Sequence, residues 1–70
     1  MKIVAVSQRV DHRLDRKETH DALDQRLAAF VKNCGYVPVP VPNALGDALD
    51  AWLPVVRPAA VVLSGGNDIG

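Results

Sequence analysis

The stretch that decides the fold is residues 36–42, which read YVPVPVP. Valine favours an extended strand, whereas proline has no backbone N–H to donate to a neighbouring strand. The backbone groups of successive strand residues point to opposite edges, so Pro38, Pro40 and Pro42 all lack their N–H on the same edge. Prolines in a sheet belong at its border for this reason. The sequence therefore predicts an edge strand that pairs with one neighbour only, through its valines.

Two other apolar runs have the composition of buried strands. Residues 2–7 read KIVAVS and residues 59–64 read AAVVLS, with β-branched side chains and little polar alternation. Strands that are covered on both faces of a parallel sheet show this pattern. We therefore expect three strands, at residues 2–7, 36–42 and 59–64.

The segment before the proline-rich strand has helical periodicity. Its apolar positions recur three or four residues apart, at Leu23, Leu27, Phe30, Val31 and Cys34. Thr19 is suited to cap the N-terminus, Asp21 suits the positive end of the helix dipole, and Gly35 suits a left-handed C-terminal position. The pattern predicts a helix over residues 19–34. The charged segment before it, residues 9–18 (RVDHRLDRKE), is interpreted as a loop.

A second helical pattern lies between the last two predicted strands. Its apolar positions are Leu45, Leu49, Trp52, Leu53 and Val56. Gly46 weakens the start of this helix, and Pro54 disturbs its end because it lacks a donor and pushes the preceding residue away from helical angles. We expect a shorter or kinked helix, most securely over residues 47–53, with Trp52 in the core.

These elements alternate as strand, helix, strand, helix, strand. Alternation with right-handed crossovers builds an α/β fold with a parallel sheet. If the proline-rich second strand is an edge, the third strand must add on the other side of the first, which gives the local order 2-1-3. This is the βαβαβ start of a doubly wound, flavodoxin-like sheet, whose ligands bind beyond the strand ends at the switch point. Residues 7–9 and 64–70 follow the two strands at that point.

Composition sets bounds on the class of protein. The chain has 70 residues, eight basic and eight acidic, so it has no charge excess that would favour nucleic acid or an anionic membrane. Its apolar N-terminal run, Ile3 to Val6, is too short for a signal peptide or a membrane span. Cys34 is the single cysteine and cannot form an intramolecular disulfide. A reducing, cytoplasmic setting is therefore expected.

Several residues are candidates for catalytic or binding roles. Gly65 and Gly66 follow the third predicted strand and could leave backbone N–H groups open to an anion, or simply form a tight turn. Arg9 could bind a carboxylate or phosphate at the switch point, or be solvated. Cys34 lies on the apolar stripe near the negative end of its helix, which favours core packing over a reactive thiolate. His12 and His20 have no spacing that would join them on a metal, so both are expected to be exposed.

Taken together, three stretches resemble the N-terminal part of class I glutamine amidotransferase-like proteins. They are MKIVAVSQR at residues 1–9, NCGYVPVPVPN at residues 33–43 and AAVVLSGGNDIG at residues 59–70. The likeness is greatest to the γ-glutamyl hydrolase branch, peptidase family C26, and within it to enzymes of the γ-glutamyl-CDP-amidate hydrolase type. The resemblance implies a cysteine-dependent hydrolase that releases glutamate from a small γ-glutamyl amide without cofactor or metal.

The resemblance also implies roles for individual residues. In the family, a backbone N–H of the glycine-rich loop after the third strand stabilises the oxyanion, which corresponds to Gly66 with Gly65 in support. Gln8, Arg9 and Asn67 lie in the same two segments and are candidate substrate-binding residues. The family's nucleophile elbow, G-x-C-x-G, and its His-x-Glu pair have no match in this sequence.

The lack of both motifs indicates that residues 1–70 are an incomplete N-terminal portion of one amidotransferase-like domain. Such a portion would be inactive alone and would need the remainder of a parent chain. Two other interpretations stay open. One is a glutaminase domain that delivers ammonia to a synthetase, and the other is a non-catalytic α/β binding or regulatory module.

Overall fold

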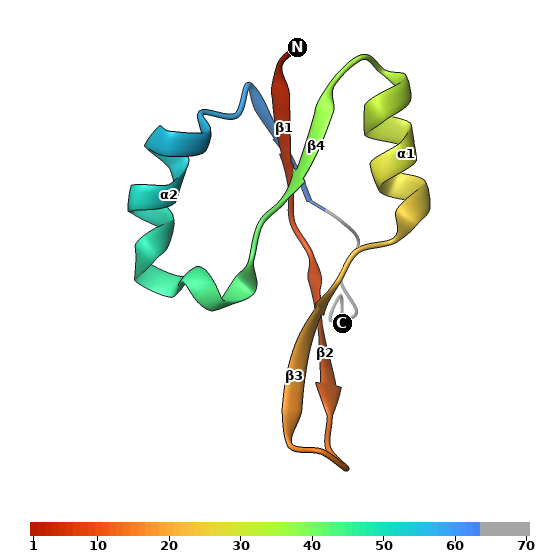
Figure 1. Cartoon of the computed structure of the whole chain (residues 1–70), viewed down its shortest axis with the longest axis vertical. Helices are drawn as coiled ribbons and strands as arrows, with labels where there is room; N and C mark the ends of the chain where they lie inside the picture. Colours follow the sequence, from red (N-terminus) through yellow and green to blue (C-terminus); the bar gives the residue numbers. More distant parts are fainter. Residues whose placement is uncertain (64–70) are drawn as a thin grey trace.

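A computed structural model describes residues 1–63 of the chain. It shows a mixed α/β protein in which a small parallel sheet, two helices and a projecting hairpin are arranged around β1 (Figure 1). In chain order the elements are β1 (Ile3–Val6), β2 (Arg9–Arg13), β3 (Glu18–Ala22), α1 (Gln25–Asn33), β4 (Val37–Pro40), the 3-10 helix η1 (Asn43–Ala48), α2 (Leu49–Val56) and β5 (Ala60–Val62). Neither α-helix of this described part is long and apolar enough to cross a membrane.

The parallel sheet has the strand order β4-β1-β5. Within it, Val4 of β1 lies opposite Pro38 in β4 and opposite Ala60 in β5. The N–H of Val37 donates to the carbonyl of Lys2, and that of Val41 donates to the carbonyl of Val6, each at 2.9 Å. The valines therefore face β1 and the prolines face outward, which confirms the pairing predicted from proline parity.

The two helices lie on opposite sides of the strands (Figure 1). The chain moves from β1 to β4 in one direction through α1, and from β4 past β1 to β5 in the other direction through α2. Right-handed crossovers in opposite directions place successive helices on opposite faces of a sheet. The α/β class expected from the sequence is thus observed.

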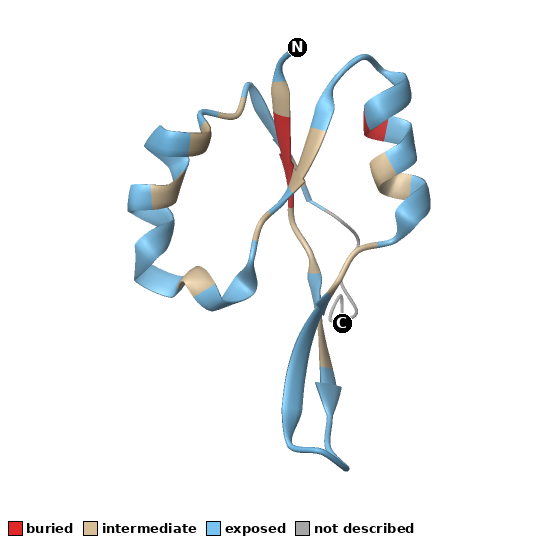
Figure 2. Ribbon diagram, viewed as in Figure 1, coloured by how far each residue is buried: buried red, intermediate tan, exposed pale blue. Residues whose placement is uncertain are grey.

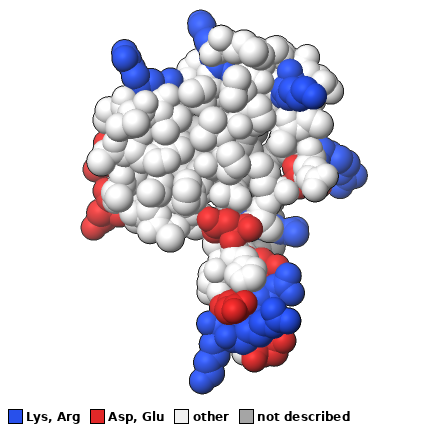
Figure 3. All heavy atoms as spheres, in the orientation of Figure 1, with Lys and Arg blue, Asp and Glu red and all other residues white. Residues whose placement is uncertain are grey.

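The predicted charged loop over residues 9–18 is wrong, because most of it belongs to an antiparallel hairpin. β2 pairs with β3 so that Asp11 lies opposite His20 and Arg13 lies opposite Glu18. Arg13 and Glu18 carry opposite charges, and such a pair directly across two strands favours their pairing. Within the strands, Arg13 Nε lies 3.4 Å from an oxygen of Asp11. The hairpin projects from the rest of the molecule and carries many of its charged side chains (Figure 3).

The first helix is shorter than predicted. It begins at Gln25 and ends at Asn33, whereas the pattern predicted residues 19–34. Asp24, not Thr19, is its N-cap, with a carboxylate oxygen that accepts a hydrogen bond from the N–H of Arg26 at 2.8 Å. The expected cap and first-turn positions are occupied by strand residues because β3 extends to Ala22. Gly35 has a φ of 92° just after the helix, as predicted.

The second helical segment begins as η1 and continues as α2, so its regular helix starts and ends later than the predicted residues 47–53. Gly46, with φ 51° and ψ −125°, interrupts the helical angles before α2. Pro54 lies inside α2, and the helix does not end there. Arg57 closes it in a left-handed conformation with φ 53°, where its N–H donates to the carbonyl of Leu53 at 2.7 Å.

The core is small and centred on β1 (Figure 2). Within the described part, four apolar residues are buried, namely Val4, Ala5, Val6 and Val31. Leu23, Leu27 and Val62 pack against this cluster and are partly buried. Cys34 is exposed, so its predicted place in the core is wrong. Trp52, also expected in the core, is half-buried.

Candidate functional site at the carboxyl ends of the parallel strands

The carboxyl ends of β1 and β5 lie side by side. Ser7, the first residue after β1, donates its N–H to the carbonyl of Val62 at 2.9 Å. β4 lies on the other side of β1, so the chain leaves β1 at the point where the strand order reverses. Open α/β sheets bind ligands beyond the strand ends at such a point.

Gln8 is held in place by two contacts with the segment after β4. Its side-chain Nε2 donates to the carbonyl of Val41 at 3.0 Å, and this interaction is partly buried. Its backbone carbonyl accepts a hydrogen bond from Asn43 Nδ2 at 3.2 Å. The predicted site residue Gln8 is therefore at the carboxyl edge, and its side-chain amide donates a hydrogen bond to the protein backbone.

Asp21 and Asn43 complete this group and were not identified from the sequence. One carboxylate oxygen of Asp21 accepts from Asn43 Nδ2 at 2.8 Å, and the other accepts from the backbone N–H of Asn43 at 3.0 Å. Asp21 lies near the end of β3, whereas Asn43 begins η1. We call Gln8, Asp21 and Asn43 the carboxyl-edge cluster. It ties the base of the hairpin to the segments that leave β1 and β4.

Arg9 is exposed at the start of β2. The pKa of Asp24 is lowered to about 2, mainly by the side-chain hydrogen bond from Arg26 and then by the backbone N–H of the same residue, with a minor contribution from the charge of Arg9. In the sequence, Arg9 directly follows Gln8 of the carboxyl-edge cluster. It is the first residue of β2, so its guanidinium belongs to the projecting hairpin. Gly65, Gly66 and Asn67 lie outside the described residues.

The other candidate side chains lie apart from this edge. His12 and His20 are exposed on the hairpin, as predicted, with His12 Nδ1 3.4 Å from Thr19 Oγ1 and His20 Nε2 3.1 Å from Glu18 Oε1. Cys34 follows α1. Within residues 1–63, no group of three or more His, Cys, Asp or Glu side chains is placed to hold a metal ion.

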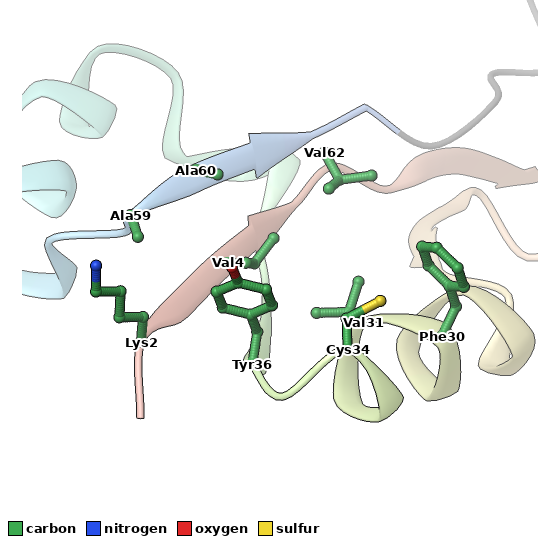
Figure 4. A pocket seen from close by; sticks show the side chains of 9 residues that line it. All are labelled: Lys2, Val4, Phe30, Val31, Cys34, Tyr36, Ala59, Ala60 and Val62. Carbon is green, nitrogen blue, oxygen red and sulfur yellow. The ribbon is translucent and has the colours of Figure 1, made fainter.

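A mostly apolar groove of about 380 Å³ lies between α1 and the parallel strands (Figure 4). Lys2 lies at one end of it and Phe30 at the other. Its lining consists of Lys2, Val4, Phe30, Val31, Cys34, Tyr36, Ala59, Ala60 and Val62. The groove runs along a face of the sheet, so it is distinct from the carboxyl edge.

Comparison with protein-family models, curated proteins and solved structures gives no significant match. The fold and the site define the class to which the chain is assigned, an α/β protein with a polar cluster at the carboxyl ends of parallel strands.

Proposed function

We propose that this chain supplies the N-terminal βαβαβ part of a cysteine-dependent hydrolase of γ-glutamyl amides. The parent would be a class I glutamine amidotransferase-like domain with a flavodoxin-like sheet. The observation that supports the proposal is the hydrogen bond between Ser7 N–H and the carbonyl of Val62, which joins the ends of β1 and β5. The two segments that resemble this family, SQR and LSGGND, both begin at that junction.

The proposed reaction requires a thiolate that attacks the amide carbonyl and donors that stabilise the resulting oxyanion. The N–H of Gly66, supported by the conformation of Gly65, is the proposed donor on this chain. The substrate is γ-glutamyl-CDP-amidate or a similar γ-glutamyl amide, and glutamate is the product. Arg9 and Asn67 are proposed to bind polar groups of the substrate, while Gln8 positions the loop after β1.

The nucleophile of this mechanism is proposed to lie in the remainder of a parent chain. Cys34 does not fit the role, because it follows the C-terminal end of α1. The nucleophile of a G-x-C-x-G elbow follows a strand, whereas the element before Cys34 is a helix. The same observation favours a second candidate function, a non-catalytic α/β binding or regulatory module.

The nucleotide sequence downstream of codon 70 distinguishes the two candidates. The hydrolase proposal expects a continuing reading frame with a strand that ends in G-x-C-x-G, followed by His-x-Glu. A frame without that cysteine would leave the binding module as the better proposal.

A complementation assay tests the chemistry directly. Residues 1–70 alone should release no glutamate from a γ-glutamyl amide, and a polypeptide with the missing elbow and His-x-Glu pair should restore thiol-dependent release. Gly66→Pro, which removes the proposed donor, should lower the restored kcat by roughly 10²–10³-fold. Release by the 70-residue chain alone that is abolished in Cys34→Ser would contradict the proposed division of the site.

A further inference from the structure

Gln8, the second residue after β1, is fixed through two of its groups. Its side-chain Nε2 donates to the carbonyl of Val41 at 3.0 Å, and its backbone carbonyl accepts a hydrogen bond from Asn43 Nδ2 at 3.2 Å. Both partners follow β4 in the chain. The bond to Val41 is partly buried, whereas the bond from Asn43 lies at the exposed surface. The segment that leaves β1 is therefore held against the segment that leaves β4.

The bond from Asn43 orients the peptide unit that joins Gln8 to Arg9. A peptide unit is planar, and Arg9 has the backbone conformation of a strand because it begins β2. A hydrogen bond to the carbonyl of Gln8 therefore also sets the direction in which the side chain of Arg9 leaves the backbone. Asn43 is itself held by Asp21, which accepts its backbone N–H at 3.0 Å and its Nδ2 at 2.8 Å. The orientation of Arg9 thus depends on Asn43.

Arg9 is a cation that this arrangement leaves available to a ligand. It is exposed, and it belongs to none of the salt bridges found within residues 1–63. It lies two residues after Ser7, whose hydrogen bond to Val62 joins the carboxyl ends of β1 and β5. A guanidinium offers a rigid set of N–H donors that matches the oxygens of a carboxylate or a phosphate. Its placement at the junction therefore suits the recognition of an anionic group.

We propose that Asn43 is a positioning residue for the substrate, which acts through Gln8 on Arg9. Arg9 binds an anionic group of the γ-glutamyl amide, Gln8 transmits the orientation, and Asn43 does not touch the substrate. The identity of the ligand rests on the proposed function. The linkage from Asn43 to Arg9 rests on the hydrogen bonds of the carboxyl-edge cluster.

Titration of the 70-residue chain, followed by NMR, tests the contact with the ligand. One probe is inorganic pyrophosphate, which represents a phosphorylated leaving group, and the other is glutamate, which represents the acyl part of the substrate. At least one probe should shift the Nε–H signal of Arg9, and Arg9→Ala should weaken its binding. The probe that binds more tightly identifies the anionic group that Arg9 recognises. If neither probe shifts this signal, the role assigned to Arg9 is overturned.

Asn43→Ala tests the positioning role in the same titration. The substitution removes the bond to the carbonyl of Gln8 and should weaken binding of the probe roughly two- to tenfold, which corresponds to the loss of one ordinary hydrogen bond. Asn33→Ala is the matched control, because Asn33 ends α1 and is outside the carboxyl-edge cluster. This control should bind the probe as the wild type does. Equal binding by Asn43→Ala and the wild type would overturn the proposal.

A reciprocal exchange separates this positioning role from the attachment of the hairpin. In the double variant Asp21→Asn with Asn43→Asp, an amide and a carboxylate still face each other, so amide exchange in β3 should match that of the wild type. The carboxylate at position 43 has no N–H to donate to the carbonyl of Gln8. Binding of the probe should therefore stay as weak as in Asn43→Ala. Full recovery of binding would show that Asn43 acts only through the hairpin, which would overturn the proposal.

Kinetics distinguish a failure of this inference from a failure of the proposed function. When the chain is complemented by a polypeptide with the elbow and the His-x-Glu pair, Asn43→Ala should raise the KM for the γ-glutamyl amide two- to tenfold and leave kcat unchanged. A lower kcat with an unchanged KM would overturn the positioning role and leave the hydrolase in place. Binding of the probe that depends on Asn43, without release of glutamate, would support the positioning role and contradict the hydrolase.

Discussion

Individual side chains fix where the elements of this protein begin and how their ends are joined. Asp24 caps α1 because its carboxylate accepts the N–H of Arg26 at 2.8 Å and also binds the guanidinium of the same residue at 2.9 Å. A carboxylate at this position also interacts favourably with the helix dipole. The sequence alone favoured Thr19 as the cap. Thr19 in fact lies in β3, a strand that the charged composition of this segment does not reveal.

The Asp24 cap predicts how stability depends on pH. The pKa of Asp24 is lowered from 3.8 to about 2, first by the side-chain hydrogen bond from Arg26. A carboxyl group whose pKa falls on folding contributes its full stabilisation above its unfolded pKa and loses it as the pH falls through the folded value. We expect urea unfolding of Asp24→Asn to show less loss of stability between pH 4 and pH 2 than the wild type. An identical pH dependence of the two proteins would contradict this assignment.

Asn43 predicts how the hairpin is attached. Its N–H and Nδ2 both donate to Asp21, and Nδ2 also donates to the carbonyl of Gln8. Asn43→Ala should lower the free energy of unfolding by about 1 kcal/mol, the usual net contribution of a hydrogen bond, and accelerate amide exchange in β3. Asp47→Ala is a matched control, since this exposed residue of η1 is outside the cluster. Equal effects of the two variants on exchange in β3 would contradict the role of Asn43.

At the scale of elements, the hairpin shows where sequence patterns are ambiguous. β2 and β3 are charged on the side that carries Asp11, Arg13, Glu18 and His20, and they have few apolar residues. Because most residues of both strands are polar, they show no alternation of apolar and polar side chains, and the sequence therefore predicts a loop. The strands are joined by their antiparallel backbone ladder, whereas the ion pairs Asp11–Arg13 and Glu18–His20 each lie along a single strand. This pairing is local in sequence, yet it has no apolar alternation that would reveal it.

Pro54 predicts a gain in stability for α2. It lies inside the helix and cannot donate the hydrogen bond that a helical residue gives to the carbonyl four residues earlier. Pro54→Ala should therefore stabilise the protein by roughly 1–3 kcal/mol, in line with the helix propensities of the two residues. The measurement is chemical denaturation, with Pro58→Ala, which lies outside the helix, as the control. No gain for Pro54→Ala, or an equal gain for Pro58→Ala, would contradict this explanation.

At the scale of the whole molecule, the small core makes the fold sensitive to β1. Val6 is 0% exposed and lies in the cluster with Val4 and Val31. Val6→Ala removes buried apolar surface and leaves a cavity, so it should cost roughly 1.5–3 kcal/mol and lower the melting temperature strongly. Val55→Ala is the control, because Val55 is 81% exposed and its change should stay within about 0.5 kcal/mol. Similar melting temperatures for the two variants would show that the core lies elsewhere.

The sequence by itself determined the features that depend on covalent structure within one residue. The absent N–H groups of Pro38 and Pro40 determined which edge of β4 pairs, and the absent side chain of Gly35 allowed the turn after α1. Such constraints act wherever the residue is placed. They predicted the pairing of β1 with β4, whereas the α/β alternation was predicted from the apolar runs and the helical periodicity.

Only the tertiary structure decided which residues distant in sequence are in contact. Asp21 and Asn43 are 22 positions apart, and their contact depends on how the hairpin and β4 both leave the sheet. Cys34 continues an apolar stripe, yet it is exposed because no helix of the described part covers the groove beside α1. A periodic pattern shows which face of a helix is apolar, whereas the neighbouring elements decide how much of that face is buried.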